Sequence, residues 1–361
     1  MDDEGAPRLL DRLDEIDAGW LTAVLRRAGH ADADIAGFAL TPIGAGNVSD
    51  TARVDLVHRG GAGAPASLVC KFRCSDAVAH AHGVASGSYH REVGSYRLVA
   101  DACRTPGLLW VAGGHDTINL VMEDLSGRAR AGDQVAGCDP AEARAVVTEL
   151  ARLHRAFFPL PRAAAPDWAM TMAETADYWV DAIARAVPLI RAEVAERLSR
   201  DEMRAVETAA RIARAWYTLP VVRATLTHGD PRVDNILFLD GADGAVEAVL
   251  IDWQMTGWRN PMHDVGYFLS GSVTEENRRA HERDLLAHYA DLIGAAYPLD
   301  AVLADYRVQL LGGLMTTIAA YALIPLTPPV HLLLLTLLRR NLAAALDWDS
   351  FAAVANDRER R

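Results

Sequence analysis

The segment from residue 227 to residue 254 constrains the fold more than any other part of this chain. Two apolar stretches, 236–238 and 249–254, flank a turn built of Gly and Asp residues, which predicts a β-hairpin. Asn235 precedes the first strand and Asp252 lies at the end of the second, so the hairpin would bring them to one end. Asp230 lies in a loop before Asn235, at that same end.

These three side chains carry oxygen atoms that suit a hard cation. Mg²⁺ binds one or two carboxylates and keeps water or substrate phosphates as further ligands. In phosphoryl transfer a carboxylate also orients the attacking hydroxyl. Each residue has a structural alternative as well: an Asx turn for Asp230, a backbone contact for Asn235 and a polar strand end for Asp252.

The cations of this chain are almost all arginine, with 35 Arg against one Lys, Lys71. A guanidinium and an ammonium differ in shape and hydration. Lys71 is therefore predicted to occupy a position that requires a compact ammonium group, with chance in an arginine-biased composition as the alternative.

The hydrophobic pattern changes along the chain. Before residue 124 it predicts helices over 18–28 and 89–103 and strands over 38–43, 48–57, 67–73, 107–112 and 117–123. After residue 127 it predicts helices over 140–158, 173–198 and 201–218 and from 274 onward, interrupted by the β-rich segment 226–256. The predicted fold is α+β and bilobal, with a small β-rich N-terminal lobe and a larger, mainly helical C-terminal lobe.

Composition excludes several classes of protein. The net charge of −12 argues against a nucleic-acid binder, which needs a basic surface. The acidic N-terminus lacks the pattern of a signal peptide, and the four cysteines are expected to be reduced thiols. A run without charge between Arg307 and Arg339 is broken by prolines, which favours two core helices over membrane insertion. We therefore expect a cytoplasmic protein.

The block His228-Gly229-Asp230, Asn235 and Asp252-Trp253-Gln254 resembles the motif of the aminoglycoside phosphotransferase and choline kinase-like superfamily, whose fold is protein-kinase-like. It looks closest to a bacterial branch related to ecdysteroid kinase-like proteins and to kinases fused to acyl-CoA dehydrogenases. The resemblance covers about residues 35–345 and is specific in the block 228–264.

The resemblance implies a role for each residue of the motif. Asp230 would be the catalytic base that faces the acceptor hydroxyl, and His228 would brace its loop. Asn235 and Asp252 would hold Mg²⁺ on the nucleotide phosphates. Lys71 would contact the α- and β-phosphates.

Further residues would bind the nucleotide. Glu92 would pair with Lys71, unless it is only a solvated residue at a helix start. Gly44, Gly46 and Asn47 form a fragment of a glycine-rich phosphate loop, with a simple turn as the alternative. Residues 118–125 resemble the interlobe hinge, so the main chains of Glu123 and Leu125 would contact adenine. Met122 would flank the adenine, or be a core methionine.

The sequence thus predicts a nucleotide-binding lobe over 1–123, a hinge over 124–127 and a catalytic and substrate-binding lobe over 128–361. The expected activity is transfer of the γ-phosphoryl group of ATP, with Mg²⁺, to a small-molecule hydroxyl. Because the uncharged helices of 308–338 could line a cleft, the acceptor is expected to be apolar or amphipathic. The alternatives are an aminoglycoside O-phosphotransferase and an inactive nucleotide-binding regulator. The oligomeric state cannot be read from the sequence.

Overall fold

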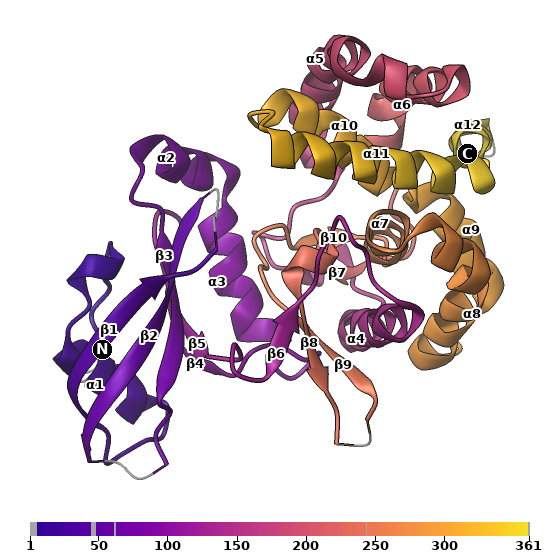
Figure 1. Cartoon of the computed structure of the whole chain (residues 1–361). Helices are drawn as coiled ribbons and strands as arrows, with labels where there is room; N and C mark the ends of the chain where they lie inside the picture. Colours follow the sequence, from indigo (N-terminus) through magenta and orange to yellow (C-terminus); the bar gives the residue numbers. More distant parts are fainter. Residues whose placement is uncertain (1–5, 45–47, 61–62, 243, 360–361) are drawn as a thin grey trace. The chain divides into compact units, whose positions relative to one another are not determined.

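The computed structural model describes residues 6–44, 48–60, 63–242 and 244–359. By contact, the chain forms two units. The first comprises Met1–Ala129 together with Ile251–Met255, and the second comprises Arg130–Leu250 and Thr256–Arg361. The first is built on an antiparallel sheet and the second is mostly helical (Figure 1), which confirms the predicted bilobal α+β class. The predicted functional division into lobes and hinge stays a prediction.

The first unit is organised by a five-stranded antiparallel sheet in the order β1-β2-β3-β5-β4. Its strands are β1 (Asp34–Pro42), β2 (Ser49–Gly60), β3 (Ser67–Arg73), β4 (Leu108–Gly113) and β5 (Ile118–Glu123). The central strand β3 carries Lys71, which is paired with Thr51 on β2 and Leu120 on β5. A central strand is held on both edges, so the Lys71 backbone has a fixed position.

Helix α1 (Ala18–Arg27) supplies the core on one side of this sheet. Trp20 on α1 packs edge-on against Phe72 and Trp110, with ring centroids 5.8 and 5.6 Å away. The helix begins where predicted, because the Asp17 side chain accepts the N–H of Trp20.

Two helices follow β3 where the sequence predicts one. Helix α2 (Ala77–Ser86) begins with Asp76 as its N-cap, and α3 runs over Ser88–Val99 rather than 89–103. Gly87, at φ 69°, separates the two helices. The shortness of α2 and its glycine obscure its periodicity, which is why the pattern misses it.

The second unit contains the predicted hairpin. Strands β8 (Ile236–Asp240) and β9 (Val246–Leu250) are antiparallel, and Ile236 is paired with Leu250. The second strand was expected to run to Gln254 but ends at Leu250, since Asp252 adopts a left-handed φ of 67° that no strand accommodates. The short strands β7 (Thr225–Thr227) and β10 (Gly257–Arg259) form a separate pair, and β6 (Ala129–Ala131) joins β8.

Helices make up the rest of the second unit. They are α4 (Pro140–Phe157), α5 (Ala176–Val194), α6 (Arg200–Tyr217), α7 (Met262–Ser272), α8 (Glu275–Ile293), α9 (Leu299–Gln309), α10 (Leu311–Leu323), α11 (Pro328–Asp347) and α12 (Ser350–Glu359). The helix expected over 173–198 is shorter than predicted, because short 3₁₀ turns precede and follow α5. Helix α4 begins at Pro140 as predicted, and its N-cap Asp139 forms a capping box with Glu142.

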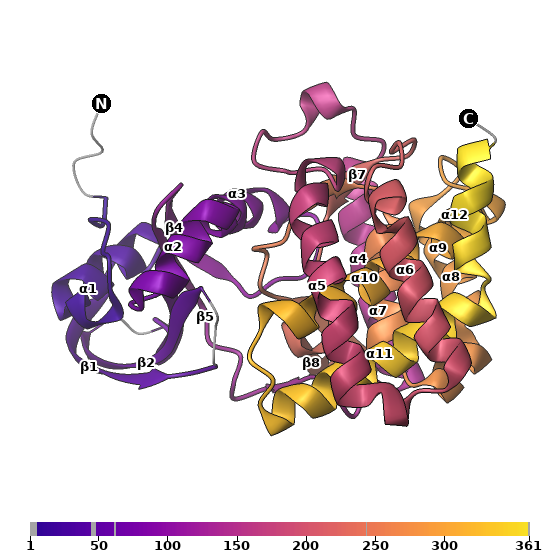
Figure 2. The ribbon, with the colours of Figure 1, turned by 90° about the horizontal axis from the view of Figure 1, so that it is seen from above.

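The uncharged run before Arg339 forms α10 and most of α11, as the prolines predict. These helices share an apolar core with α5 and α6 (Figure 2), to which α11 contributes Leu334, Leu335, Leu338 and Leu342. By length and composition, α11 is the one helix of the described chain that could cross a membrane, and 44% of its most apolar window is buried. The core helix of a soluble protein can have the same length and composition.

Candidate active site

Lys71 is the centre of a buried charge cluster in the first unit. Its Nζ donates to Oε1 of Glu92 at 2.7 Å and to Oδ1 of Asp252 at 2.8 Å. The Lys71 and Glu92 side chains are 11% and 3% exposed, and that of Asp252 is 23% exposed. The structure therefore brings together three of the predicted site residues, and Glu92 is not the solvated helix-start residue of the alternative interpretation.

Burial and the neighbouring charges shift the pKa values of Lys71 and Glu92 in opposite directions. Burial by itself lowers the pKa of Lys71, but the carboxylates of Asp252 and Glu92 outweigh it and raise that pKa above its usual value. Burial raises the pKa of Glu92 to about 6, although Lys71 opposes this shift. Lys71 is thus held as an ammonium ion, with Asp252 the more exposed of its two partners.

A residue of helix α3 binds the segment that carries Asp252 and so holds it in the first unit. Arg91, next to Glu92, donates from Nε to the Gln254 carbonyl at 2.7 Å. The left-handed φ of Asp252 costs energy for a residue with a Cβ, and such conformations concentrate at functional sites. The helix that supplies Glu92 therefore also anchors the backbone that follows this strained residue.

The loop before β8 places the second group of predicted residues. Asn235 is buried, and its Nδ2 donates to the backbone oxygen of Asp230 at 3.0 Å and to Oδ2 of Asp230 at 3.2 Å. The Asp230 N–H donates to Nδ1 of His228 at 3.4 Å. Oδ1 of Asp230 is buried and makes no hydrogen bond of ordinary geometry within the described chain. A buried carboxylate oxygen without such a hydrogen bond can accept a proton or a hydrogen bond from another molecule.

Asp264, on α7, holds this loop through its backbone. Its carboxylate accepts the N–H groups of His228 at 2.6 Å and Gly229 at 2.9 Å, and Nε2 of His154 lies 3.1 Å away. Burial acts to raise the Asp264 pKa, but the hydrogen bond with His154 and the charges of His154, His263 and His228 lower it to about 2. Gly229 has a φ of 89°, which a residue with a side chain adopts only under strain. The turn before Asp230 therefore depends on both Gly229 and Asp264.

Two neighbours of Asp230 are absent from the sequence-based assignment. Nε of Arg232 lies 3.6 Å from Oδ2 of Asp230. Burial and the Asp230 charge together hold the pKa of the Tyr267 hydroxyl well above its usual value. Tyr267 lies one turn after Asp264 on α7, so the helical spacing of these two residues was the available signal.

The segment expected to form the hinge follows β5. The Glu123 N–H donates to the Gly107 carbonyl at 2.8 Å, and the Leu125 carbonyl accepts from Arg128 and Ala129 at 3.0 and 2.8 Å. The Asp124 carboxylate accepts from Arg53 at 2.6 Å and from Ser67 at 2.7 Å. These bonds hold the segment in one conformation.

The remaining nucleotide-binding predictions have different outcomes. Met122 is buried in β5, with 7% of its surface exposed. Gly44 is exposed after β1 and has a φ of 73°. Gly46 and Asn47 lie outside the described residues, so the phosphate loop stays a prediction.

The donor atoms fit a hard cation. Because Nδ2 of Asn235 makes both bonds to Asp230, its amide oxygen is the atom that a cation could use. Oδ1 of Asp252 accepts a hydrogen bond from Lys71, and its Oδ2 accepts one from Nε2 of Gln254. These oxygens match the preference of Mg²⁺. Across the described residues, no group of three or more His, Cys, Asp or Glu side chains could hold a metal ion.

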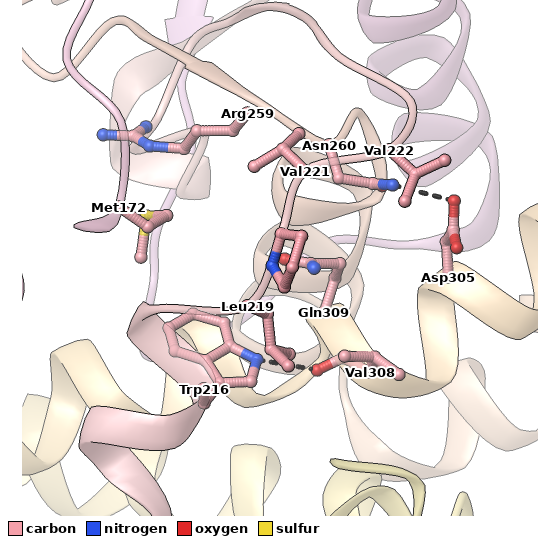
Figure 3. Close-up of a pocket in the computed structure, with 11 residues that line it drawn as sticks. Met172, Trp216, Leu219, Val221, Val222, Arg259, Asn260, Asp305, Val308 and Gln309 are labelled. Carbon is pink, nitrogen blue, oxygen red and sulfur yellow. Dashed lines mark hydrogen bonds between the residues drawn. The ribbon is translucent and has the colours of Figure 1, made fainter. Parts of the chain in front are cut away.

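A space of about 580 Å³ in the second unit contains none of the predicted site residues. Figure 3 shows Trp216, Asn260 and Asp305 around it. Nε1 of Trp216 donates to the Val308 carbonyl at 3.0 Å, and Nδ2 of Asn260 donates to Asp305 at 2.7 Å (Figure 3). Asp305 also receives two bonds from Arg223. Since these polar groups bind one another, we assign the space no function.

Solved structures with a similar fold include phosphotransferases. The GDP complex of wild-type aminoglycoside 2'-phosphotransferase-IIIa is 13% identical, with 93% of this chain and 97% of that chain covered at a TM-score of 0.50. Plasmodium vivax ethanolamine kinase is 10% identical, with 96% and 91% covered at a TM-score of 0.48. At 13% identity the likeness to the aminoglycoside phosphotransferase concerns the fold alone. No curated protein sequence matches this chain.

The sequence itself matches a family profile over residues 39–304, which is more than half of the chain. The matched range contains Lys71, Glu92, Asp230, Asn235 and Asp252, the residues gathered in the two clusters described above. The expected superfamily is thereby confirmed, as is the expectation that the chain is a phosphotransferase. The protein belongs to the phosphotransferase enzyme family known as APH.

Proposed function

We propose that this protein is an ATP- and Mg²⁺-dependent kinase that phosphorylates a hydroxyl group of a small molecule. The observation that carries the proposal is the Asp230 carboxylate. Its Oδ2 is oriented by Asn235, and its buried Oδ1 has no hydrogen bond of ordinary geometry within the described chain. A carboxylate in that condition can receive the hydroxyl proton.

The reaction requires little covalent chemistry from the chain. The acceptor oxygen forms a bond to the γ-phosphorus as the bond from that phosphorus to the β–γ bridging oxygen breaks. The acceptor proton passes to Asp230, and ADP leaves with the bridging oxygen. Lys71, kept as an ammonium by Glu92, stabilises charge on the α- and β-phosphates.

Asn235 and Asp252 would hold Mg²⁺, which when bound neutralises phosphate charge. His228 and Asp264 keep the Asp230 loop in place. Adenine would contact the main chain of Glu123 and Leu125 beside Met122. Because the Leu125 carbonyl is already bonded, its N–H is the group we propose as a donor to adenine. A phosphate loop at Gly44, Gly46 and Asn47 and a cytoplasmic location complete the proposal.

The test is Asp230→Asn, which keeps the size of the side chain and removes its basicity. We expect turnover of ATP with an accepted alcohol to fall by about 10²–10⁴-fold. Nucleotide affinity and melting temperature should stay near wild-type values. Activity should require Mg²⁺ and be lost in EDTA. Turnover within about threefold of wild type would refute the role of Asp230.

An inactive nucleotide-binding regulator and an aminoglycoside O-phosphotransferase are the other candidates. A regulator would bind nucleotide but form no ADP with any alcohol, and Asp230→Asn would change nothing measurable. An aminoglycoside kinase would phosphorylate kanamycin-type compounds in preference to uncharged alcohols, so a parallel assay with both separates the candidates.

A further inference from the structure

A second space in the helical unit adjoins the Asp230 loop. It encloses about 510 Å³, a volume that includes the open solvent at its mouth. Two residues of its wall, Arg232 and Tyr267, are the neighbours of Asp230 described above. The remaining wall comes mainly from α10 and α11, which lie side by side in Figure 2.

The wall of this space, here called the α10–α11 pocket, is apolar over most of its area. Its apolar members are Gly271, Gly313, Ala320, Ile324, Leu333, Leu334 and Leu337. Gly313 allows the two helices to approach, because a Cβ there would lie 2.5 Å from Oδ1 of Asn341. The close packing of α10 against α11 therefore forms this part of the wall.

Most polar groups of the wall are already bonded within the fold. Asn341 donates to Thr317 at 3.1 Å and accepts from Ser270 at 2.6 Å. Gln134 accepts from the backbone N–H of Val233 at 2.9 Å. Among wall residues, Thr316 is partly exposed and stands on α10. Few polar groups thus remain for a ligand.

The charge of the pocket wall further restricts which ligands can bind. No Asp or Glu occurs among the described residues that line the pocket, and its one charged side chain is the cation Arg232. A positively charged ligand group would lose its hydration there without gaining a counter-ion, which is costly. An aliphatic ligand would instead exchange water for leucine and isoleucine side chains.

We infer that the α10–α11 pocket binds the body of the acceptor, and that the acceptor is an alcohol with an apolar body and no positive charge. This inference rests on the proposed function, since the kinase reaction is what requires an acceptor beside Asp230. Under this inference, the residues of α10 and α11 determine that neutral acceptors bind in preference to cationic ones.

The experiment compares octan-1-ol with 8-aminooctan-1-ol, which share the hydroxyl and the chain and differ in the charge at the far end. Binding to the full chain is measured by ligand-observed NMR, and phosphoryl transfer from Mg·ATP by ADP release. We expect octan-1-ol to bind at least about tenfold more tightly, the ratio that a difference of 1.4 kcal/mol produces. Equal or tighter binding of the amine, or binding of neither, would overturn the inference.

Matched variants test whether the pocket causes the preference for octan-1-ol over the amine. Thr316→Asp adds a carboxylate at nearly constant size and should shift the binding ratio about tenfold toward the amine. Thr316→Asn, with the same shape and no charge, should leave the ratio unchanged. Leu337→Glu and Leu337→Gln on α11 repeat the comparison should a Thr316 variant fail to fold. An unchanged ratio in folded Asp or Glu variants would refute the assignment.

The two readouts separate the inference from the proposed function. Selective binding of octan-1-ol without ADP release would refute the kinase proposal and leave the pocket assignment standing. ADP release with both alcohols at equal affinity would support the kinase and refute the assignment.

Discussion

At the scale of single residues, the chain uses its one lysine where two carboxylates meet. Glu92 and Asp252 lie within 2.8 Å of Nζ of Lys71, in a site with little contact to water. An ammonium offers three donors around one nitrogen, which suits two carboxylates and a third acceptor. A guanidinium is planar and wider, so its donors cannot converge in the same way.

Lys71→Arg should therefore lower kcat although the charge is kept. Displacement of the carboxylates and phosphates by about 1 Å can cost on the order of 100-fold in rate. Steady-state ADP release checks this, with Arg73→Lys on the same strand as the control, which should stay near wild-type activity. A fully active Lys71→Arg enzyme would show that the single lysine reflects composition alone.

At the scale of elements, helix α7 organises the loop before Asp230. Asp264 accepts two backbone N–H groups of that loop, and Tyr267, one turn later, lies against Asp230. The buried Asp264 carboxylate thus links the backbone of the loop to α7. The geometry of the loop that carries Asp230 therefore depends on α7 as well as on the hairpin.

Asp264→Asn would replace one accepting oxygen by an NH₂ group that faces backbone donors. Leaving buried donors without a partner costs about 1–3 kcal/mol each, so we expect the free energy of unfolding to fall by roughly that amount or more. Urea denaturation measures it. The exposed Asp300, in the first turn of α9, supplies the control, since Asp300→Asn should change stability by about 0.5 kcal/mol or less.

At the scale of the whole molecule, stability depends on pH through buried histidine. His263 is buried beside Trp216, and burial followed by the charge of Arg259 lowers its pKa from 6.5 to about 3. The unfolded chain binds a proton below pH 6.5 that the folded chain does not bind until about pH 3. Stability therefore decreases as the pH falls through this window.

The expected loss from His263 is about 1.4 kcal/mol per pH unit, or about 2 kcal/mol at pH 5. Denaturant unfolding at pH 7.5 and pH 5 measures it. In His263→Leu the decrease between the two pH values should be smaller by that amount, whatever the absolute stability of the variant. Exchange of the exposed His82 for Gln is the control. An identical decrease in wild type and His263→Leu would contradict the assignment.

Local sequence determined the elements whose signals lie within a few residues. Helices α1 and α4 begin at the predicted residues, where Asp17 and Asp139 cap them, and the Gly/Asp turn places β8 opposite β9. Strand β3 with Lys71 was likewise predictable, because alternation and capping are properties of neighbouring residues. The motif around Asp230 could be read for the same reason, since its residues are consecutive or nearly so.

Tertiary structure alone decided which distant residues meet. The segment of Asp252 joins the first unit because Lys71 and Arg91 bind it there, although it follows a strand of the second unit. The burial of Glu92 and the α10–α11 pocket also come from packing between separate elements. Periodicity tells which face of a helix is apolar, but the partner of that face depends on how all the elements pack together.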